Sequence, residues 1–562
     1  MRKFPLFIFI FVLLISHSFI SAQIVYEPVG NDIYSFLSLL SQKGIIEFND
    51  QIKPVPRKYI AQKLLEINSK ADQLTSLEKE EALFYDKEFG FELDFINPQN
   101  HLNNSEGTGL HPFLNYLGND QFGRLRLFSY SDSLFKLNIS PILGMSLGKN
   151  AASKYTHTWS GIGLYGYIGN SIGFSFNYRD NGETGATVDM TKQFTPVTGV
   201  IVAKESSSDN IQYSEAHAIL ATDWSWGEVS IGKDFMEWGY GESGKLVLSD
   251  KAPSFPFIRL DLRLTSWLRF NYFHAWLNSD VVDSASSYPT YLTSDPNQST
   301  RELFINKYLV SHTIIVTPVK GLDVSLGESM IYSDKLEIGY LIPINFFRLM
   351  DHYLSSANNN VGGNAQFFLG VSSRDHLKNT HLYGTWFIDE ITLEGLFDKM
   401  KQRNQFGFTL GGSLTDLPID NLTAVLEYTK IYPFVYSHYI PTLLYTNASY
   451  VMGDWMGNNA DRIYASLNYR FIRGLQGTIW GQYIRKGESG TPEEQYSQPQ
   501  PPFLFGLRTN YTYLGIDLKY EITHELFVRS TFQNLLTSKE VTKGTFNDVN
   551  GKQFLFMVYY GI

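Results

Sequence analysis

The stretch FIRLDLRL, residues 257–264, decides the fold class, because apolar and charged side chains alternate along it without a break. Apolar residues take the even positions from 258 to 264, and Arg259, Asp261 and Arg263 take the odd positions between them. Side chains that repeat with a period of two point to opposite faces of a β-strand. The stretch therefore predicts a strand with one apolar face and one charged face.

The same alternation recurs at 172–178 and at 514–522, where Asp517, Lys519 and Glu521 form a second charged row. Aromatic residues make up 15% of the chain, with 35 Tyr and 41 Phe. Transmembrane β-barrels turn the apolar face to lipid and the polar face to the lumen, and they carry aromatic girdles. We predict an antiparallel transmembrane barrel. A large secreted all-β enzyme or sandwich is the alternative, because a one-sided sheet also alternates.

The first 22 residues are predicted to be a secretory signal peptide. Arg2 and Lys3 precede an unbroken apolar run from Leu6 to Ile15, which is too short to span a membrane as a helix. The net charge of −10 disfavours a nucleic-acid partner, and the absence of cysteine excludes disulfides and thiolate metal sites. We expect no cofactor.

The chain divides at residue 88 into a helical part and a barrel. Residues 23–88 show helical spacing, with Pro56 at a helix start and a capping box formed by Thr75 and Glu78. This segment predicts a small bundle of three helices. Residues 89–562 form the predicted barrel, with FGFELDFI at 89–96 as an early strand.

The connections between the predicted strands alternate in length, as in bacterial outer-membrane barrels with short periplasmic turns and long outer loops. Tight turns near 169–170, 224–226 and 523–524 alternate with long polar loops at 97–120, 181–210, 234–255, 277–306, 431–459, 486–510 and 535–551. The connection 343–365 breaks this order. Its apolar residues have helical spacing, so it predicts a helix that covers or enters the periplasmic mouth; the alternative is an unusually long turn.

Several segments, in this order, give the chain a resemblance to a known family. They are NDIYSFLSLLSQKGIIEFNDQIKPVPRKYIAQKLLEI (31–67), GKDFMEWGYGESGKLVLSDKAPSFPFI (232–258), EIGYLIPINFF (337–347), LEYTKIYPF (426–434) and SYVMGDWMGNNADRIY (449–464). Together they resemble the capsule assembly Wzi family. The resemblance implies an outer-membrane barrel of 18 strands, a periplasmic helical bundle, and a surface lectin that attaches or organises capsular polysaccharide. Counting strand candidates along the sequence gives up to about 22.

Two predicted outer loops carry the residue types that bind sugars. A sugar ring stacks on an aromatic face, and planar polar groups hydrogen-bond to its hydroxyls. We predict polysaccharide contacts from a first loop and a second loop: Trp238, Tyr240, Glu242 and Lys245; then Tyr450, Asp454, Trp455, Asn458, Asn459 and Asp461. The alternative is that Trp238 and Trp455 are girdle residues at the membrane interface. The GDWMGNNAD segment lacks the spacing of an EF-hand loop, so no metal is predicted.

The charged rows admit two interpretations. Mixed signs within one row favour a salt-bridge network that fills the lumen, whereas a selective channel more often shows one sign. The network would consist of Arg259, Asp261, Arg263, Asp517, Lys519 and Glu521. The alternative is that these rows guide a polar solute through an open lumen.

The function that these patterns favour is a non-enzymatic one. None of the 12 His lies in a recognised catalytic motif. We expect a monomeric protein of the Gram-negative outer membrane that binds capsular or extracellular polysaccharide. The alternative is an outer-membrane channel or exporter for anionic polysaccharide or small solutes.

Overall fold

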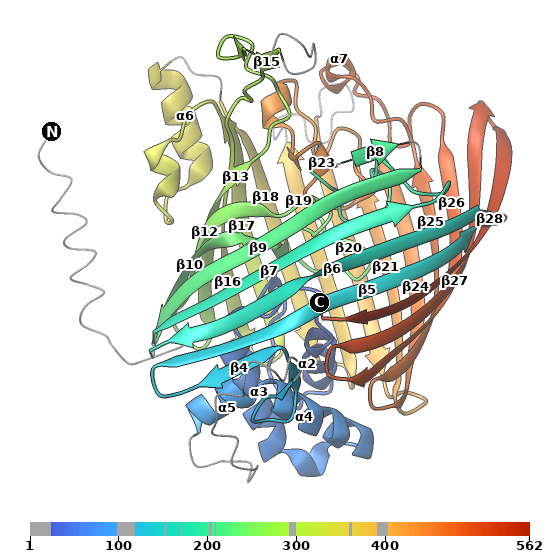
Figure 1. The fold of residues 1–562 in the computed structure, drawn as a ribbon. Coiled ribbons are helices and arrows are strands. Elements are labelled where there is room, and N and C mark those ends of the chain that lie inside the picture. The colour runs from blue at the N-terminus through green and yellow to red at the C-terminus, as the bar shows by residue number, and fades with distance from the viewer. Residues whose placement is uncertain are drawn as a thin grey trace, which may run out of the picture.

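The chain forms a closed antiparallel β-barrel whose wall has 18 strands (Figure 1). The computed structural model describes residues 24–97, 118–150, 153–169, 171–201, 205–207, 209–291, 299–358, 362–390 and 403–561. The barrel closes where the last strand pairs with the first, Tyr560 opposite Leu143. The predicted fold class is therefore confirmed, and the strand count is the lower of the two predicted values.

The wall strands follow one another in chain order. They are β5 (Phe135–Asn150), β6 (Ser153–Ile168), β7 (Ile172–Thr184), β9 (Asn210–Trp224), β10 (Gly227–Asp234), β12 (Phe255–Arg263), β13 (Leu268–Leu277), β16 (Lys307–Val319), β17 (Leu322–Ser333), β18 (Asn364–Arg374), β19 (Thr380–Glu390), β20 (Gln405–Thr415), β21 (Leu422–Ile431), β24 (Ala460–Ile472), β25 (Leu475–Lys486), β26 (Thr509–Thr523), β27 (Leu526–Thr542) and β28 (Thr545–Tyr560).

Short strands lie beside the wall or inside it. β4 (Phe128–Ser131) and β8 (Glu205–Ser207) pair with the ends of β5 and β9. Four two-residue pairs form small ribbons: β1 (Ile52–Lys53) with β11 (Glu237–Trp238), β2 (Gly118–Asn119) with β3 (Leu125–Arg126), β14 (Tyr288–Pro289) with β15 (Thr300–Arg301), and β22 (Thr446–Asn447) with β23 (Tyr450–Val451).

The alternation in the sequence separates lumen from lipid as expected. On β12, Phe257 and Arg259 face the lumen and are buried, whereas Leu264 just beyond the strand is half exposed. On β26, Ile516 and Leu518 are about half exposed on the outer surface. Such a strand places its apolar side chains against lipid and its charged side chains in the polar lumen.

Four helices close one end of the barrel (Figure 1): α2 (Ile33–Gln42), α3 (Arg57–Ser69), α4 (Ser76–Glu88) and α5 (Gly90–Ile96). The capping box of Thr75 and Glu78 starts α4, as predicted. His524, in a tight turn of the wall, stacks on Phe84 of α4 at 3.7 Å. The tight turns of the wall therefore lie at this end, which we call the helical end. No helix among the described residues is long and apolar enough to cross a membrane.

The prediction of a strand at 89–96 is wrong, because this segment forms α5. Its seven-residue alternation is too short to separate strand from helix, and tertiary contacts decide the matter. Phe91 packs edge-on against Phe122 at 5.1 Å, and Glu92 forms an ion pair with Arg57 at 2.9 Å. The barrel wall starts only at β5.

Two predictions about loops are also wrong. The segment 343–365 does contain a helix, α6 (Phe347–Asn358), but Figure 1 shows it at the end opposite to α2–α5, which we call the loop end. The strand count from the sequence is too high, so it assigns this connection to the periplasmic side when it lies at the opposite end of the barrel. The segment 535–551 is not a loop, since β27 and β28 run through it and are joined by a turn at 543–544. The signal peptide and most of the loop 97–120 lie outside the described residues.

A buried carboxyl in the helical end makes the stability of this unit depend on pH. Asp86 of α4 is buried and accepts two hydrogen bonds from the Asn68 amide, at 2.9 and 3.1 Å. Burial raises the pKa of Asp86 to about 6. Between the unfolded pKa near 4 and this value the folded state binds more protons, so stability falls as the pH rises through this window.

We therefore expect Asp86→Asn to stabilise the helical end at pH 8 by about 3 kcal/mol, and to remove its loss of stability between pH 4 and pH 6. The measurement is thermal loss of the helical circular dichroism signal in detergent at pH 4.5 and pH 8. Asp72→Asn, at an exposed position of the same unit, is the control. An equal response of the two variants to pH would contradict the assignment.

Candidate functional site

The first predicted sugar-binding loop, residues 235–254, folds into the lumen instead of projecting from it. Trp238 pairs with Ile52 through the ribbon of β11 and β1. We call residues 24–56, which include α2 and precede α3, the N-terminal segment. The indole ring lies edge-on to Phe273 of the wall at 5.0 Å, and the side chain is 1% exposed. We call residues 235–254 the first inward loop.

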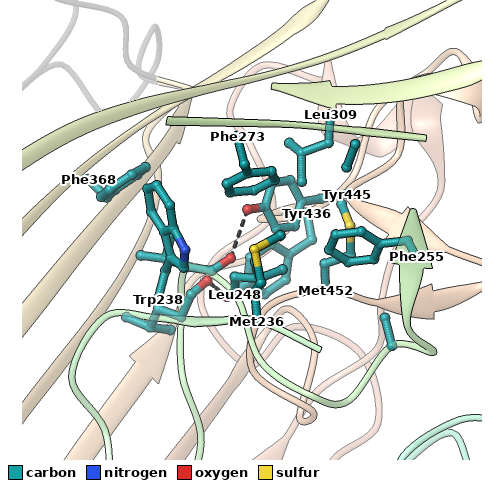
Figure 2. Close-up of a cluster of buried hydrophobic side chains, with 14 of the residues drawn as sticks. Met236, Trp238, Leu248, Phe255, Phe273, Leu309, Phe368, Tyr436, Tyr445 and Met452 are labelled. Carbon is teal, nitrogen blue, oxygen red and sulfur yellow. Dashed lines mark hydrogen bonds between the residues drawn. The ribbon is translucent and has the colours of Figure 1, made fainter. Parts of the chain in front are cut away.

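The second predicted loop, residues 432–459, packs over the first inside the barrel. Figure 2 shows the apolar cluster between them, in which Tyr436, Tyr445 and Met452 surround Leu248. The Tyr445 hydroxyl donates to the Val247 carbonyl at 2.7 Å, and the Tyr436 hydroxyl donates to Leu246 at 2.8 Å. We call residues 432–459 the second inward loop.

A buried charged cluster ties both inward loops to the wall. Glu427 of β21 accepts hydrogen bonds from the backbone N–H groups of Glu242 and Ser243, at 2.6 and 3.1 Å. Asp454 of the second loop pairs with Arg462 of β24 at 2.9 Å, and the Arg462 guanidinium lies 3.9 Å from Glu427. All three charged side chains are fully buried. We call Glu427, Asp454 and Arg462 the anchor cluster.

The N-terminal segment fills the lumen from the helical end and meets the first inward loop there. The Arg374 guanidinium on the wall donates to the Phe48 carbonyl and to Asp50, both at 2.7 Å. Next along the chain, Gln51 accepts a hydrogen bond through its carbonyl from the N–H of Gly239, at 2.9 Å. Chain segments from the N-terminus and from both inward loops thus occupy the lumen together.

The predicted lumen charges are paired with several partners. Arg259 pairs with Asp261 at 2.7 Å, within one strand, and Arg263 pairs with Glu228 at 3.1 Å. Lys519 reaches Asp32 of the N-terminal segment at 2.7 Å. Asp517 pairs with Arg529 at 2.9 Å, and Glu521 accepts from the Glu525 N–H at 3.2 Å. Five of the six predicted lumen charges therefore pair with an opposite charge on the wall or on the N-terminal segment, and Glu521 is held by a backbone N–H.

The expectation that the sugar-binding candidates lie on surface loops is wrong. Most of them are buried inside the barrel, and this position also excludes the girdle alternative for both Trp residues. Those buried inside the barrel are Trp238, Tyr240, Tyr450, Asp454, Trp455, Asn458 and Asn459, whereas Asp461 is buried on the outward face of β24, on the same side as Ile463. Whether any of these side chains contacts polysaccharide stays a prediction. A sequence signal for the inward fold was present, since Leu246, Val247 and Leu248 form an apolar run that an outer loop would expose to water.

Three of the candidates share a cavity of about 320 Å³ in the lumen. Tyr240, Glu242 and Lys245 line its inner end, together with Tyr383 and Tyr464 of the wall. Its other end reaches the tight turn at Arg473 and the helix α4, so the cavity extends toward the helical end. A second lumen cavity of about 330 Å³ lies between the N-terminal segment and the wall around β5–β9.

A pocket of about 240 Å³ lies at the loop end, and the sequence did not point to it. Its lining includes His438, Tyr496, Asp389, Glu390 and Gln405, from the second inward loop, the segment after α7 (Pro492–Gln495), and the wall. Aromatic rings thus stand beside carboxylate and amide groups here. The only signal would have been the run YSHY at 436–439.

Aromatic rings line this pocket and also lie next to it. Tyr439 is 53% exposed, and its ring stacks on His438 with centroids 4.6 Å apart. Tyr496 lies edge-on to Tyr439 at 5.6 Å and carries the Arg403 guanidinium on its face at 5.0 Å. Gln405 donates to Glu390 at 3.3 Å. We call this group the loop-end pocket.

A comparison with family models identifies the family of this chain. The model of the family described as "Capsule assembly protein Wzi" matches residues 166–535. This chain belongs to the capsule assembly Wzi family. The chain is thus an outer-membrane β-barrel of that family.

The chain is also similar to solved structures of outer-membrane proteins, and one of them shows the same fold. The structure of Wzi from Escherichia coli, titled an outer-membrane protein involved in group 1 capsule assembly and a carbohydrate-binding β-barrel, aligns with a TM-score of 0.54 and 12% identity, covering 96% of this chain and 100% of that one. Pseudomonas aeruginosa OccK7 aligns over 77% of this chain and 99% of its own, with a TM-score of 0.42 and 11% identity. No curated protein matches the sequence.

Proposed function

We propose that this Wzi family protein binds a capsular or extracellular polysaccharide at its loop end and holds it at the cell surface, without catalysing a reaction. Family membership supports the role in capsule assembly, and the structurally similar Escherichia coli protein is titled a carbohydrate-binding barrel. The loop-end pocket supports the binding step, because it brings half-buried aromatic rings and the adjacent exposed ring of Tyr439 together with carboxylates and amides.

The proposed orientation puts the loop end outside the cell and α2–α5 in the periplasm. Short turns gather at the helical end, and bacterial outer-membrane barrels have short periplasmic turns and longer outer loops. We propose a monomer, in which the filled lumen serves to position the loop end. A channel role is disfavoured by the inward loops and the N-terminal segment that occupy the lumen.

Removing the exposed ring of Tyr439 and the half-buried ring of Tyr496 should weaken polysaccharide binding. We expect Tyr439→Ala combined with Tyr496→Ala to lower the affinity about tenfold, since each aromatic contact contributes roughly 0.5–1.5 kcal/mol beyond area burial. The measurement is binding of the producing strain's purified polysaccharide to the detergent-solubilised protein. Tyr291→Ala is the control, since this side chain is fully exposed on another loop.

If the wild type binds the polysaccharide and the double variant binds it with the same affinity, the binding site does not lie at the loop-end pocket. In cells, deletion of the gene should release polysaccharide into the medium while its synthesis continues. Unchanged attachment in the deletion strain would contradict the proposed function itself.

A further inference from the structure

The connection between β17 and β18 lies on the outer face of the barrel wall. Side chains at even positions of β16 and β17 face outward, because their odd neighbours, such as Leu309 and Ile331, pack in the lumen core. From outward positions, Tyr272 donates to the Tyr340 carbonyl at 2.9 Å, and His312 Nδ1 donates to the Pro343 carbonyl at 2.9 Å. We call residues 334–356, which include the short helix η2 (Ile338–Leu341), the outer segment.

The wall under the outer segment carries a buried carboxylate on its outward face. Glu328 on the outer face is 2% exposed, and its carboxylate accepts from the N–H groups of Phe347 and Arg348, at 2.9 and 2.7 Å. These N–H groups belong to the first turn of α6, which leaves them without partners in the helix. The outer segment thus covers a carboxylate that hydrocarbon could not solvate.

Rings complete this contact. Tyr332 of the wall lies between Tyr308 and Tyr340, with centroids 4.8 and 4.6 Å away, and Phe347 packs on His312 at 4.3 Å. The buried cluster holds Phe270, Tyr272, Tyr308, Val310, Met330, Tyr332, Tyr340 and Phe347. The outer segment is therefore a packed part of the wall and not a loop that projects from it.

The other side of the outer segment is apolar and uncovered. Ile344 is 84% exposed, and its neighbours are also open to the surroundings: Ile338, Leu341, Ile342, Phe346, Leu349 and Tyr353. Seven large apolar side chains on one short segment form a patch of a kind that soluble surfaces rarely carry.

This patch continues the lipid-facing surface of the barrel. Phe346 contacts Phe367 on the outer face of β18, with centroids 5.9 Å apart. The next outward side chains toward the helical end, Ile314, Leu326 and Leu369, are exposed on the wall. The outer surface of an outer-membrane barrel wall faces lipid. The patch is continuous with that surface, so it also faces lipid.

We propose that the outer segment is embedded in the outer leaflet of the membrane and that its exposed apolar side chains contact lipid acyl chains. The part of the outer segment nearest the helical end is Pro343, which contacts His312. His312 is five residues along β16 from Lys307, which pairs with Ser333 at the loop end of the wall. At about 3.3 Å per residue this is roughly 16 Å along the strand. Lys335, 63% exposed and near that pair, marks the end at the membrane surface.

The absence of cysteine allows a direct test, because a single introduced thiol can be labelled with an environment-sensitive fluorophore. The variants are Ile344→Cys in the outer segment, Leu326→Cys on the wall as the lipid-exposed control, and Tyr291→Cys on an outer loop as the water-exposed control. Each is reconstituted in phosphatidylcholine vesicles. Quenching is measured with lipids that carry a nitroxide on the acyl chain and, separately, with aqueous iodide.

We expect lipid quenching at position 344 within about twofold of that at 326, and iodide quenching several-fold weaker than at 291. Quenching at 344 that matches position 291 would overturn the proposal. Protection from both quenchers, with chemical cross-linking between copies, would overturn it in favour of a protein interface.

A second variant separates attachment from lipid contact. In Ile344→Cys, adding Glu328→Ala removes the acceptor for the α6 N-terminus, and we expect iodide quenching at 344 to rise several-fold while the barrel still shows heat-modifiable migration in electrophoresis. Adding Arg301→Ala, an exposed substitution on another loop, should change nothing. Unchanged quenching with Glu328→Ala would show that this carboxylate does not hold the outer segment.

Discussion

Replacing Arg462 by Met should release both inward loops from the wall. The Arg462 side chain is fully buried, pairs with Asp454 at 2.9 Å and lies 5.3 Å from the Trp455 ring. Its loss leaves the carboxylates of Asp454 and Glu427 buried without a cation. Breaking a buried pair by removing one partner costs roughly 3–5 kcal/mol. This cost is a large fraction of the free energy of unfolding of a whole domain, which is about 5–15 kcal/mol.

The consequence is measurable as an ion current. With the loops docked, we expect the wild type to pass little current in planar bilayers, because the N-terminal segment and both loops occupy the lumen. In Arg462→Met we expect frequent openings, together with faster proteolysis within 432–459. Steady large currents from the wild type would instead support the alternative of a channel.

The control for Arg462→Met is Arg485→Met. Arg485 forms an ion pair with Asp461 at 2.6 Å, but the Arg485 side chain is 39% exposed, and without it Asp461 still accepts a hydrogen bond from the Tyr428 hydroxyl at 3.1 Å. Exposed pairs contribute roughly 0–1 kcal/mol. We expect this variant to behave like the wild type. Equal currents and equal cleavage in both variants would show that the anchor cluster does not hold the loops.

A compensating change sharpens the interpretation. Adding Asp454→Asn to Arg462→Met removes one of the two stranded charges, so part of the loop docking should return. The gain should appear as slower proteolysis than in the single variant. A general loss of barrel folding would show no such recovery.

The barrel could be predicted from the sequence because its signal is local. In FIRLDLRL, the polarity of each residue shows which face of the wall it occupies. Lipid outside the barrel requires apolar side chains there, and the charged side chains pair with one another in the lumen. The capping box of Thr75 and Glu78 is equally local, and it formed as expected. Both rest on contacts within a few residues.

The candidate site could not be predicted in the same way, because its geometry depends on distant contacts. Trp238 lies inside the barrel because its strand pairs with Ile52, far away in the sequence. The composition of the loop suits a sugar site and a lumen plug equally, since both need aromatic rings and polar groups. His438, Tyr439 and Tyr496 come together at the loop end only after the second inward loop is docked.

Replacing Arg57 by Met should destabilise the helical end more than any change on its surface. The guanidinium of Arg57, in the first turn of α3, pairs with Glu27 at 2.5 Å, with Glu88 at 3.1 Å and with Glu92 at 2.9 Å. Removing one partner of a buried ionic group costs roughly 3–5 kcal/mol. Glu88 keeps a second cation, Arg124, and this limits the loss.

The pH should modulate this loss in a defined direction. Burial raises the pKa of Glu27 to about 7 even with Arg57 beside it. Without the cation the pKa of this carboxyl rises further, so the folded variant binds a proton that the unfolded chain releases. Stability in Arg57→Met should therefore recover as the pH falls from 8 to 5.

The comparison that decides the role of Arg57 is with its neighbour Lys58. Lys58→Met removes a single ion pair, between Lys58 and Asp223 at 3.3 Å, and the Lys58 side chain is 21% exposed. We expect the free energy of unfolding to fall by less than about 1 kcal/mol. Thermal loss of the helical signal in detergent, at pH 5 and pH 8, measures all variants. Adding Glu27→Gln to Arg57→Met should restore stability at pH 8 and flatten the pH response. If the double variant responds to pH as the single one does, the uncompensated charge lies on Glu92, whose remaining partner is the Tyr167 hydroxyl.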